Sequence, residues 1–234
     1  MIDPGVAPGP YVAYAARPVL APDLRACSSR APVCVHASSP RDGTAAMATL
    51  DAFERAWETL TGALAVPAPD VDPSTLAYDV FIVEPQSELG TTTLEARDVR
   101  SRFDRARAFT TIDRRVRAGC VLDALAAKML ARASLFRVAP ATEDGTARAQ
   151  SAYLAELVAP CSVGLSADAI LAFQSRPERA FCDSRAGSET AVAGGAEDGG
   201  PSPLDALFSE CAPAFWARLE CAFGRTPRGF ATAA

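Results

Sequence analysis

The sequence predicts an α+β domain, mainly helical, in which a small β-sheet packs on a pair of helices. Apolar residues recur at helical spacing over residues 50–64, the pattern of an amphipathic helix. Residues 78–83 and 108–113 are short runs rich in β-branched and aromatic side chains, which is typical of strands. Two further apolar stripes over residues 121–158 predict the helix pair.

The remaining elements follow from composition. Residues 1–46 are rich in Pro, Ala and Ser and show no sustained period, so we expect an irregular N-terminal arm. Residues 47–234 are expected to form a single α+β domain, with a flexible Gly- and Ala-rich loop at 184–203. Residues 91–107 predict a helix or an ordered loop, and residues 204–223 predict a last helical stripe.

Charge and hydropathy exclude some classes of partner. The formal net charge of -5 argues against a nucleic-acid partner. No run approaches the roughly 18 apolar residues of a membrane span. Lys128 is the only lysine and asparagine is absent, a bias that indicates the GC-rich genome of a bacterium.

The chain contains seven cysteines, an odd number, which predicts at least one free thiol or intermolecular partner. We expect two or three disulfides in an exported protein, periplasmic or extracellular, with Cys27–Cys34 as the most plausible short loop. Residues 1–5 show no basic or apolar region of a signal peptide, so we expect a mature chain with an added methionine. The alternative is a reduced cytoplasmic protein in which the cysteines are small buried apolar residues.

Candidate chemistry is sparse. Cys34 and His36 lie two residues apart, so both would point to the same side of a strand and could form a nucleophile pair. The alternative interpretation is that both residues are structural. Asp79 and Glu84 are interpreted as strand-end acids. The sequence contains no nucleophile elbow, dinucleotide fingerprint or phosphate-binding loop.

One segment concentrates positive charge, and it could grip an anionic ligand or an acidic partner. The alternative is a solvated face paired with neighbouring acids. The residues singled out as contacts are Arg97, Arg100, Arg102, Arg105 and Arg107.

The two helices expected over residues 120–158 place Val121 and Leu125 four residues apart on the first and Asp144 at the start of the second. This layout resembles the active-site helix pair of gluzincin zinc metallopeptidases. In that family, HExxH places two zinc-binding histidines on one helix, and a carboxylate on the next helix is the third ligand. The corresponding positions here run from Val121 through Leu122 to Leu125, and Asp144 precedes a Gly-Thr-Ala sequence. Neither histidine is present, and leucine replaces the general base.

The resemblance therefore implies a peptidase-like fold with no bound metal, no cofactor and no peptidase chemistry. We expect a pseudoenzyme, a binding or accessory protein with a protein or peptide partner. Two alternatives stay open: an active hydrolase using Cys34 and His36 or an unrecognised carboxylate site, and a structural or interaction protein of unrelated helical fold.

Overall fold

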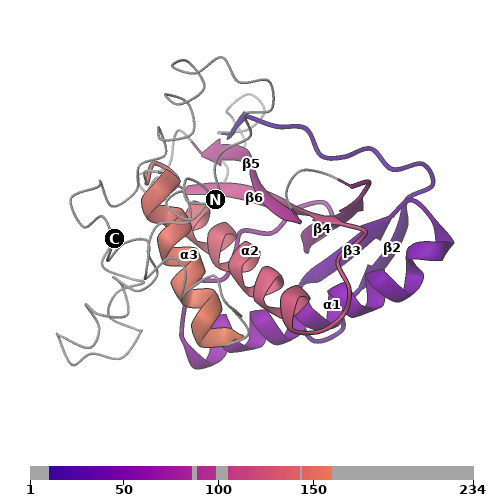
Figure 1. Cartoon of the computed structure of the whole chain (residues 1–234). Helices are drawn as coiled ribbons and strands as arrows, with labels where there is room; N and C mark the ends of the chain where they lie inside the picture. Colours follow the sequence, from indigo (N-terminus) through magenta and orange to yellow (C-terminus); the bar gives the residue numbers. More distant parts are fainter. Residues whose placement is uncertain (1–10, 86–88, 99–104, 143, 160–234) are drawn as a thin grey trace, which may run out of the picture.

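The computed structural model describes residues 11–85, 89–98, 105–142 and 144–159, which form a six-stranded mixed sheet and its covering helices (Figure 1). The strand order is β1-β5-β6-β4-β3-β2. The strands are β1 (Tyr11–Ala13), β2 (Leu24–Cys27), β3 (Val33–Ala37), β4 (Tyr78–Val83), β5 (Gly90–Asp98) and β6 (Arg105–Asp113). The helical elements are η1 (Pro40–Asp42), α1 (Gly43–Trp57), η2 (Glu58–Ala63), α2 (Cys120–Val138) and α3 (Asp144–Val158).

The centre of the sheet is parallel and its flanks are antiparallel. Strands β3, β4 and β6 run parallel, whereas β2 pairs antiparallel with β3, and β5 pairs antiparallel with both β6 and β1. Helix α1 and segment η2 make the crossover from β3 to β4, the connection that two parallel neighbours require. A register shift between Leu94 and Ala96 interrupts the β5–β6 pairing.

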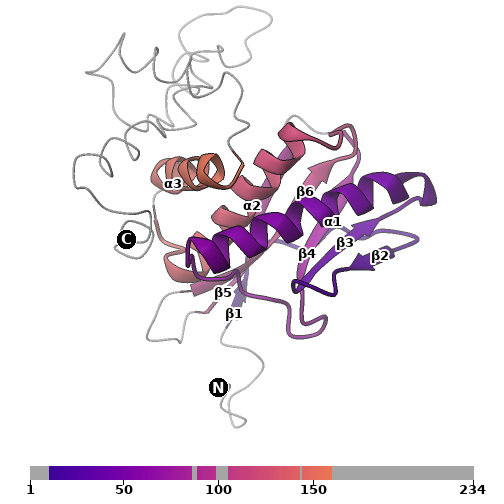
Figure 2. The same ribbon diagram turned by 90° about the horizontal axis from the view of Figure 1, so that it is seen from below.

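One face of the sheet, the core face, is covered by α1 and α2 (Figure 2). Val35, Val80 and Ile112 project from the three parallel strands into a cluster that includes Phe53 of α1 and Leu130 of α2. All five side chains are almost fully buried, so this layer supplies the main apolar stabilisation of the fold. Helix α3 lies against α2.

A chain of buried and partly buried hydroxyl groups connects the core face to α2. The hydroxyl groups of Tyr78 and Thr110 lie 2.6 Å apart, and those of Thr92 and Thr110 lie 3.1 Å apart. The Thr92 hydroxyl also donates to the backbone oxygen of Met129 at 3.0 Å. Burial, only partly offset by these hydrogen bonds, raises the pKa of Tyr78, so its hydroxyl stays protonated.

The opposite face, the strap face, is crossed by residues 14–23, which we call the strap. Strand β1 lies at one edge of the sheet and β2 at the other, so the chain between them must cross from edge to edge (Figure 1). Beneath it, side chains that alternate with the core residues are also buried, among them His36, Phe81 and Phe109. Both faces of the central strands are therefore removed from water.

The prediction of an α+β fold is consistent with this structure, and several elements are confirmed. The helix of residues 50–64 corresponds to α1 and η2, the strand of residues 78–83 is β4, and residues 108–113 lie within β6. The helix pair is present as α2 and α3, although α1 and α2, rather than α2 and α3, form the layer on the sheet.

Two predictions of local structure were wrong, and both underestimated the sheet. The expected irregular arm contributes β1, β2 and β3 in residues 11–46, and the described parts of the segment 91–107 belong to the antiparallel strands β5 and β6 rather than to a helix or loop. Strand β3 is buried along its whole length because it lies inside the sheet, and its five residues were too short a signal among the surrounding Pro and Ser residues. The apolar–polar alternation of β5 and β6 is hard to recognise in the sequence, because their arginines pair with acids on neighbouring strands.

The loop expected at 184–203 and the helical stripe at 204–223 lie outside the described residues.

Candidate functional site

Arg17 of the strap joins three carboxylates from separate parts of the chain. Its Nε and Nη2 atoms donate to the two carboxylate oxygens of Glu95 at 2.7 and 2.9 Å. Its Nη1 atom lies 2.5 Å from Asp79 Oδ2 and 2.6 Å from Asp72 Oδ2. The side chain of Asp79 is fully buried, and those of Asp72 and Glu95 are 12% and 13% exposed. Arg107 donates to Glu95 as well, at 2.9 Å.

His36 lies between two carboxylates, one from the strap and one from the sheet. Its Nδ1 is 2.9 Å from Asp23 Oδ1, its Nε2 is 3.1 Å from Asp79 Oδ1, and its ring stacks on Phe81 with centroids 4.7 Å apart. A neutral imidazole has one N–H group, so only the protonated ring donates to both carboxylates. Burial lowers the pKa of His36, but hydrogen bonds to Asp79 and Asp23 outweigh it, and the net shift is upward.

These contacts link seven side chains that pair chiefly with one another. We call this group the strap network: Arg17, Asp23, His36, Asp72, Asp79, Glu95 and Arg107. Buried charges persist when they are paired and hydrogen-bonded to one another. In this arrangement both nitrogens of the one histidine in the chain are already engaged. The network therefore fastens the strap to the sheet.

Cys34, the proposed partner of His36, is bonded to another cysteine. A disulfide joins Cys27 to Cys34, which are directly opposite each other on β2 and β3. This confirms the disulfide expected from the short loop. The nucleophilic form of cysteine is the thiolate, so the disulfide-bonded Cys34 cannot act as a nucleophile. Cys120 is also disulfide-bonded.

The gluzincin-like positions lie at the start of α2 and α3. Val121 is 58% exposed, Leu122 is 2% exposed, and Leu125 is partly buried against the hydrophobic core. Asp144 opens α3, where the structure describes its backbone alone. The resemblance is therefore untested and stays a prediction.

Two arginines of the arginine segment, Arg105 and Arg107, lie beside acids. Arg107 contacts Glu95, and Arg105 Nε lies 3.7 Å from Asp98 Oδ2. Arg97 lies on β5 and also has an interaction partner. These contacts favour the structural interpretation of the segment over an anion grip. Arg100 and Arg102 lie outside the described residues.

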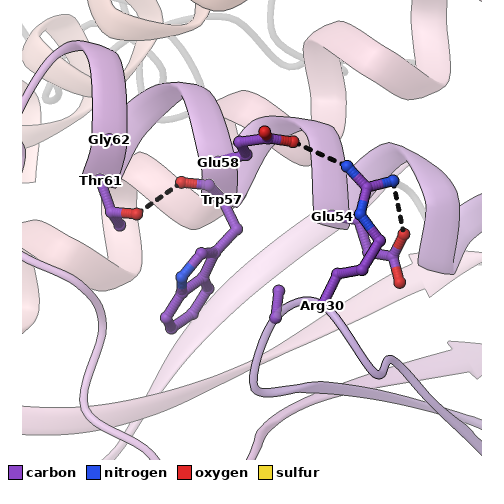
Figure 3. A pocket seen from close by; sticks show the side chains of 7 residues that line it. Arg30, Glu54, Trp57, Glu58, Thr61 and Gly62 are labelled. Carbon is purple, nitrogen blue, oxygen red and sulfur yellow. Dashed lines mark hydrogen bonds and ion pairs between the residues drawn. The ribbon is translucent and has the colours of Figure 1, made fainter.

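The second candidate site is an open cavity of about 320 Å³ between α1 and the turn that connects β2 to β3. Figure 3 shows Trp57 extending from the helix toward this turn, with the Arg30 guanidinium reaching up to two glutamates. Arg30 Nη2 donates to Glu58 at 2.9 Å, and Arg30 Nη1 is 3.8 Å from Glu54. We call this the Trp57 pocket; its lining residues are Arg30, Ala31, Glu54, Trp57, Glu58, Thr61 and Gly62.

The pocket lies where the helix changes its winding. Segment η2 is π-helical, and the Leu64 N–H group donates to the backbone oxygen of Thr59. The hydroxyl of Thr61 donates to the backbone oxygen of Trp57 at 2.8 Å, a contact that competes with regular helical bonding. Space beside Gly62 is open. Single π-helical turns are frequent at functional sites.

Sequence reasoning missed most of the strap network, although one signal was present. Asp79 is a charged residue inside the apolar run of β4, and a carboxylate buried there requires partners. It was interpreted as a strand-end acid together with Glu84, which is exposed and pairs with Arg114. The identity of the partners depends on tertiary structure, because the strap meets β4 and β5 across long sequence separations.

No family model, curated protein or solved structure matches this chain. Within the residues that the structure describes, no group of three or more His, Cys, Asp or Glu side chains is arranged to hold a metal ion. In the same part of the chain, no helix is both long and apolar enough to cross a membrane.

Proposed function

We propose that the protein is a non-catalytic binding or accessory protein. The observation that carries this proposal is the internal pairing of the strap network. Asp79, Glu95 and His36 are paired and largely buried under the strap, although Asp23 is half exposed, whereas catalytic acid–base groups must reach a substrate. Accessible charged groups, Arg30 and Glu58 among them, lie beside an aromatic side chain at the Trp57 pocket, where they can reach a ligand.

The sequence of α2 supports the same proposal. In the gluzincin-like arrangement Val121 and Leu125 occupy the positions of the zinc-binding histidines, and apolar side chains cannot ligate zinc. Leu122, at the position of the general base, is buried and cannot polarise water. In the terms of that family the protein would be a pseudopeptidase.

The disulfides support export to an oxidising compartment. Cys27–Cys34 is formed and Cys120 is also disulfide-bonded, and such bonds are rare in the reducing cytosol of mesophiles. A free-thiol count of protein purified from its native host, by mass spectrometry after alkylation with and without reduction, tests this part. Seven alkylated cysteines without reduction would overturn it.

Metal content and hydrolase activity test the main proposal. We expect less than about 0.1 equivalent of zinc in protein purified without chelators, given the absence of histidine ligands at the HExxH positions. We also expect no turnover of peptide or ester substrates, and no difference between the wild type and a Cys34→Ser variant. Stoichiometric zinc would overturn the pseudopeptidase proposal, and an activity that Cys34→Ser abolishes would favour the hydrolase alternative.

A further inference from the structure

We propose that the Trp57 pocket binds a single guanidinium group, such as an arginine side chain of a peptide partner; this rests on the proposed binding function. The volume of about 320 Å³ is at the lower end for ligand sites and suits one side chain rather than a large cofactor. Three features of the lining determine the ligand chemistry: its charge, its aromatic surface and the weakness of its internal ion pair.

The first feature is an excess of negative charge. Glu54 and Glu58 face a single internal cation, Arg30, so the lining carries one net negative charge. Glu54 is only 13% exposed, yet its nearest cation is 3.8 Å away, longer than a normal hydrogen bond. A half-buried carboxylate with such a distant partner gains from a second cation, which would also neutralise the pocket.

The second feature is the indole of Trp57. It borders the same cavity as the two carboxylates (Figure 3). A cation that lies on an indole face beside carboxylates is stabilised by both. A planar guanidinium fits this combination better than an ammonium group, because it stacks on aromatic rings and binds a carboxylate through two N–H groups.

The third feature is that Arg30 is a weakly held occupant. Its side chain is 64% exposed, and its hydrogen-bonded partner Glu58 is 70% exposed, so their ion pair contributes little. An incoming guanidinium therefore competes with Arg30 for the carboxylates. Removal of Arg30 should strengthen binding, an effect that a purely structural role of the pocket does not predict.

The test is an NMR titration of ¹⁵N-labelled full-length protein with N-acetyl-arginine amide. The chain has two tryptophans, Trp57 and Trp216, and a Trp57→Phe variant assigns the indole N–H signal of Trp57. We expect a saturable shift of that signal with a dissociation constant of roughly 1–10 mM. The neutral citrulline analogue should leave the signal unmoved, and 0.5 M salt should weaken binding because the contact is exposed.

Two variants make the test specific. Glu54→Gln should weaken binding by about 3- to 10-fold, because it removes the half-buried carboxylate. Arg30→Gln should strengthen binding by about 3-fold, because it removes the competing cation. Arg41→Gln is the control: Arg41 is an exposed arginine of η1, and its replacement should leave the affinity unchanged.

The proposal is overturned if the Trp57 signal does not move at 50 mM ligand, if the citrulline analogue moves it equally, or if Arg30→Gln weakens binding. Zinc content and hydrolase activity are measured separately. A failed titration with no zinc and no turnover therefore rejects the guanidinium ligand and leaves the non-catalytic function standing.

Discussion

Replacement of Arg17 by methionine should be among the most destabilising single changes in the strap. Arg17→Met keeps an unbranched side chain but removes the cation shared by Glu95, Asp79 and Asp72, whose side chains are between 0% and 13% exposed. Removal of one partner from a buried charge cluster costs about 3–5 kcal/mol. Because Arg17 is itself 22% exposed, we expect about 3 kcal/mol, a large share of a typical stability of about 5–15 kcal/mol.

Urea denaturation followed by circular dichroism at pH 7 measures this loss. Arg17→Lys keeps the charge without the two-pronged contact to Glu95, so it should lose roughly half as much. Arg25→Met is the matched control, because Arg25 is exposed on β2 and should change stability by less than about 0.5 kcal/mol. If Arg17→Met and Arg25→Met differ by less than about 0.5 kcal/mol, the strap network does not stabilise the fold.

The loss should also depend on pH in a defined direction. Burial raises the pKa of Asp72, but hydrogen bonds from Ser74 and the charge of Arg17 outweigh this, and the net shift is downward. Such a carboxylate stabilises the fold above its unfolded pKa of about 3.9, and this stabilisation is lost as the pH falls through the folded value. The difference in the free energy of unfolding between the wild type and Arg17→Met should therefore narrow below about pH 4. A difference that widens there would contradict a stabilising ion pair between Arg17 and Asp72.

Three further predictions concern His36, the disulfide and the hydroxyl chain. Because the folded pKa of His36 is raised, the contribution of its protonated ring to stability is complete below about pH 6.5 and is lost as the pH rises through the folded pKa. Urea titrations from pH 5 to 9 should show this decline in the free energy of unfolding, and the decline should be smaller in Asp23→Asn. A flat wild-type profile would refute this prediction. The double variant Cys27→Ala/Cys34→Ala should lose about 2 kcal/mol, as loop entropy predicts for a separation of 7 residues; an unchanged urea midpoint would contradict this. Tyr78→Phe should cost about 1 kcal/mol in the same assay, since it removes one buried hydrogen bond, and a more stable variant would show that this bond contributes nothing.

The elements with a strong periodic pattern could be predicted from the sequence, and those defined by their neighbours could not. Helix α1 and strand β4 show their burial in their own residues, so both were found. Strand β3 is too short to show a period, and the polar face of the β5–β6 hairpin meets the strap network rather than solvent. The sequence alone does not distinguish charged side chains that face solvent from charged side chains that pair across strands.

The candidate sites show the same limit. Cys27–Cys34 could be predicted because the two cysteines are close in the chain. The role of Arg17 could not be predicted, because its carboxylate partners lie 62 and 78 residues away in the sequence. The Trp57 pocket was also missed: Trp57 fits the apolar stripe of α1, and only the position of the β2–β3 turn reveals that its indole borders a cavity.

The strap has a consequence for the order in which the chain folds. Arg17 is made first during synthesis, but Asp79 and Glu95, which hold it, follow 62 and 78 residues later. Such distant contacts close only after the intervening strands are in place. Until then no contact fastens the strap over the sheet face that carries Phe81 and Phe109, so we expect an early stage of folding in which this aromatic surface is exposed. We therefore expect the strap to be synthesised early and to dock on the sheet last.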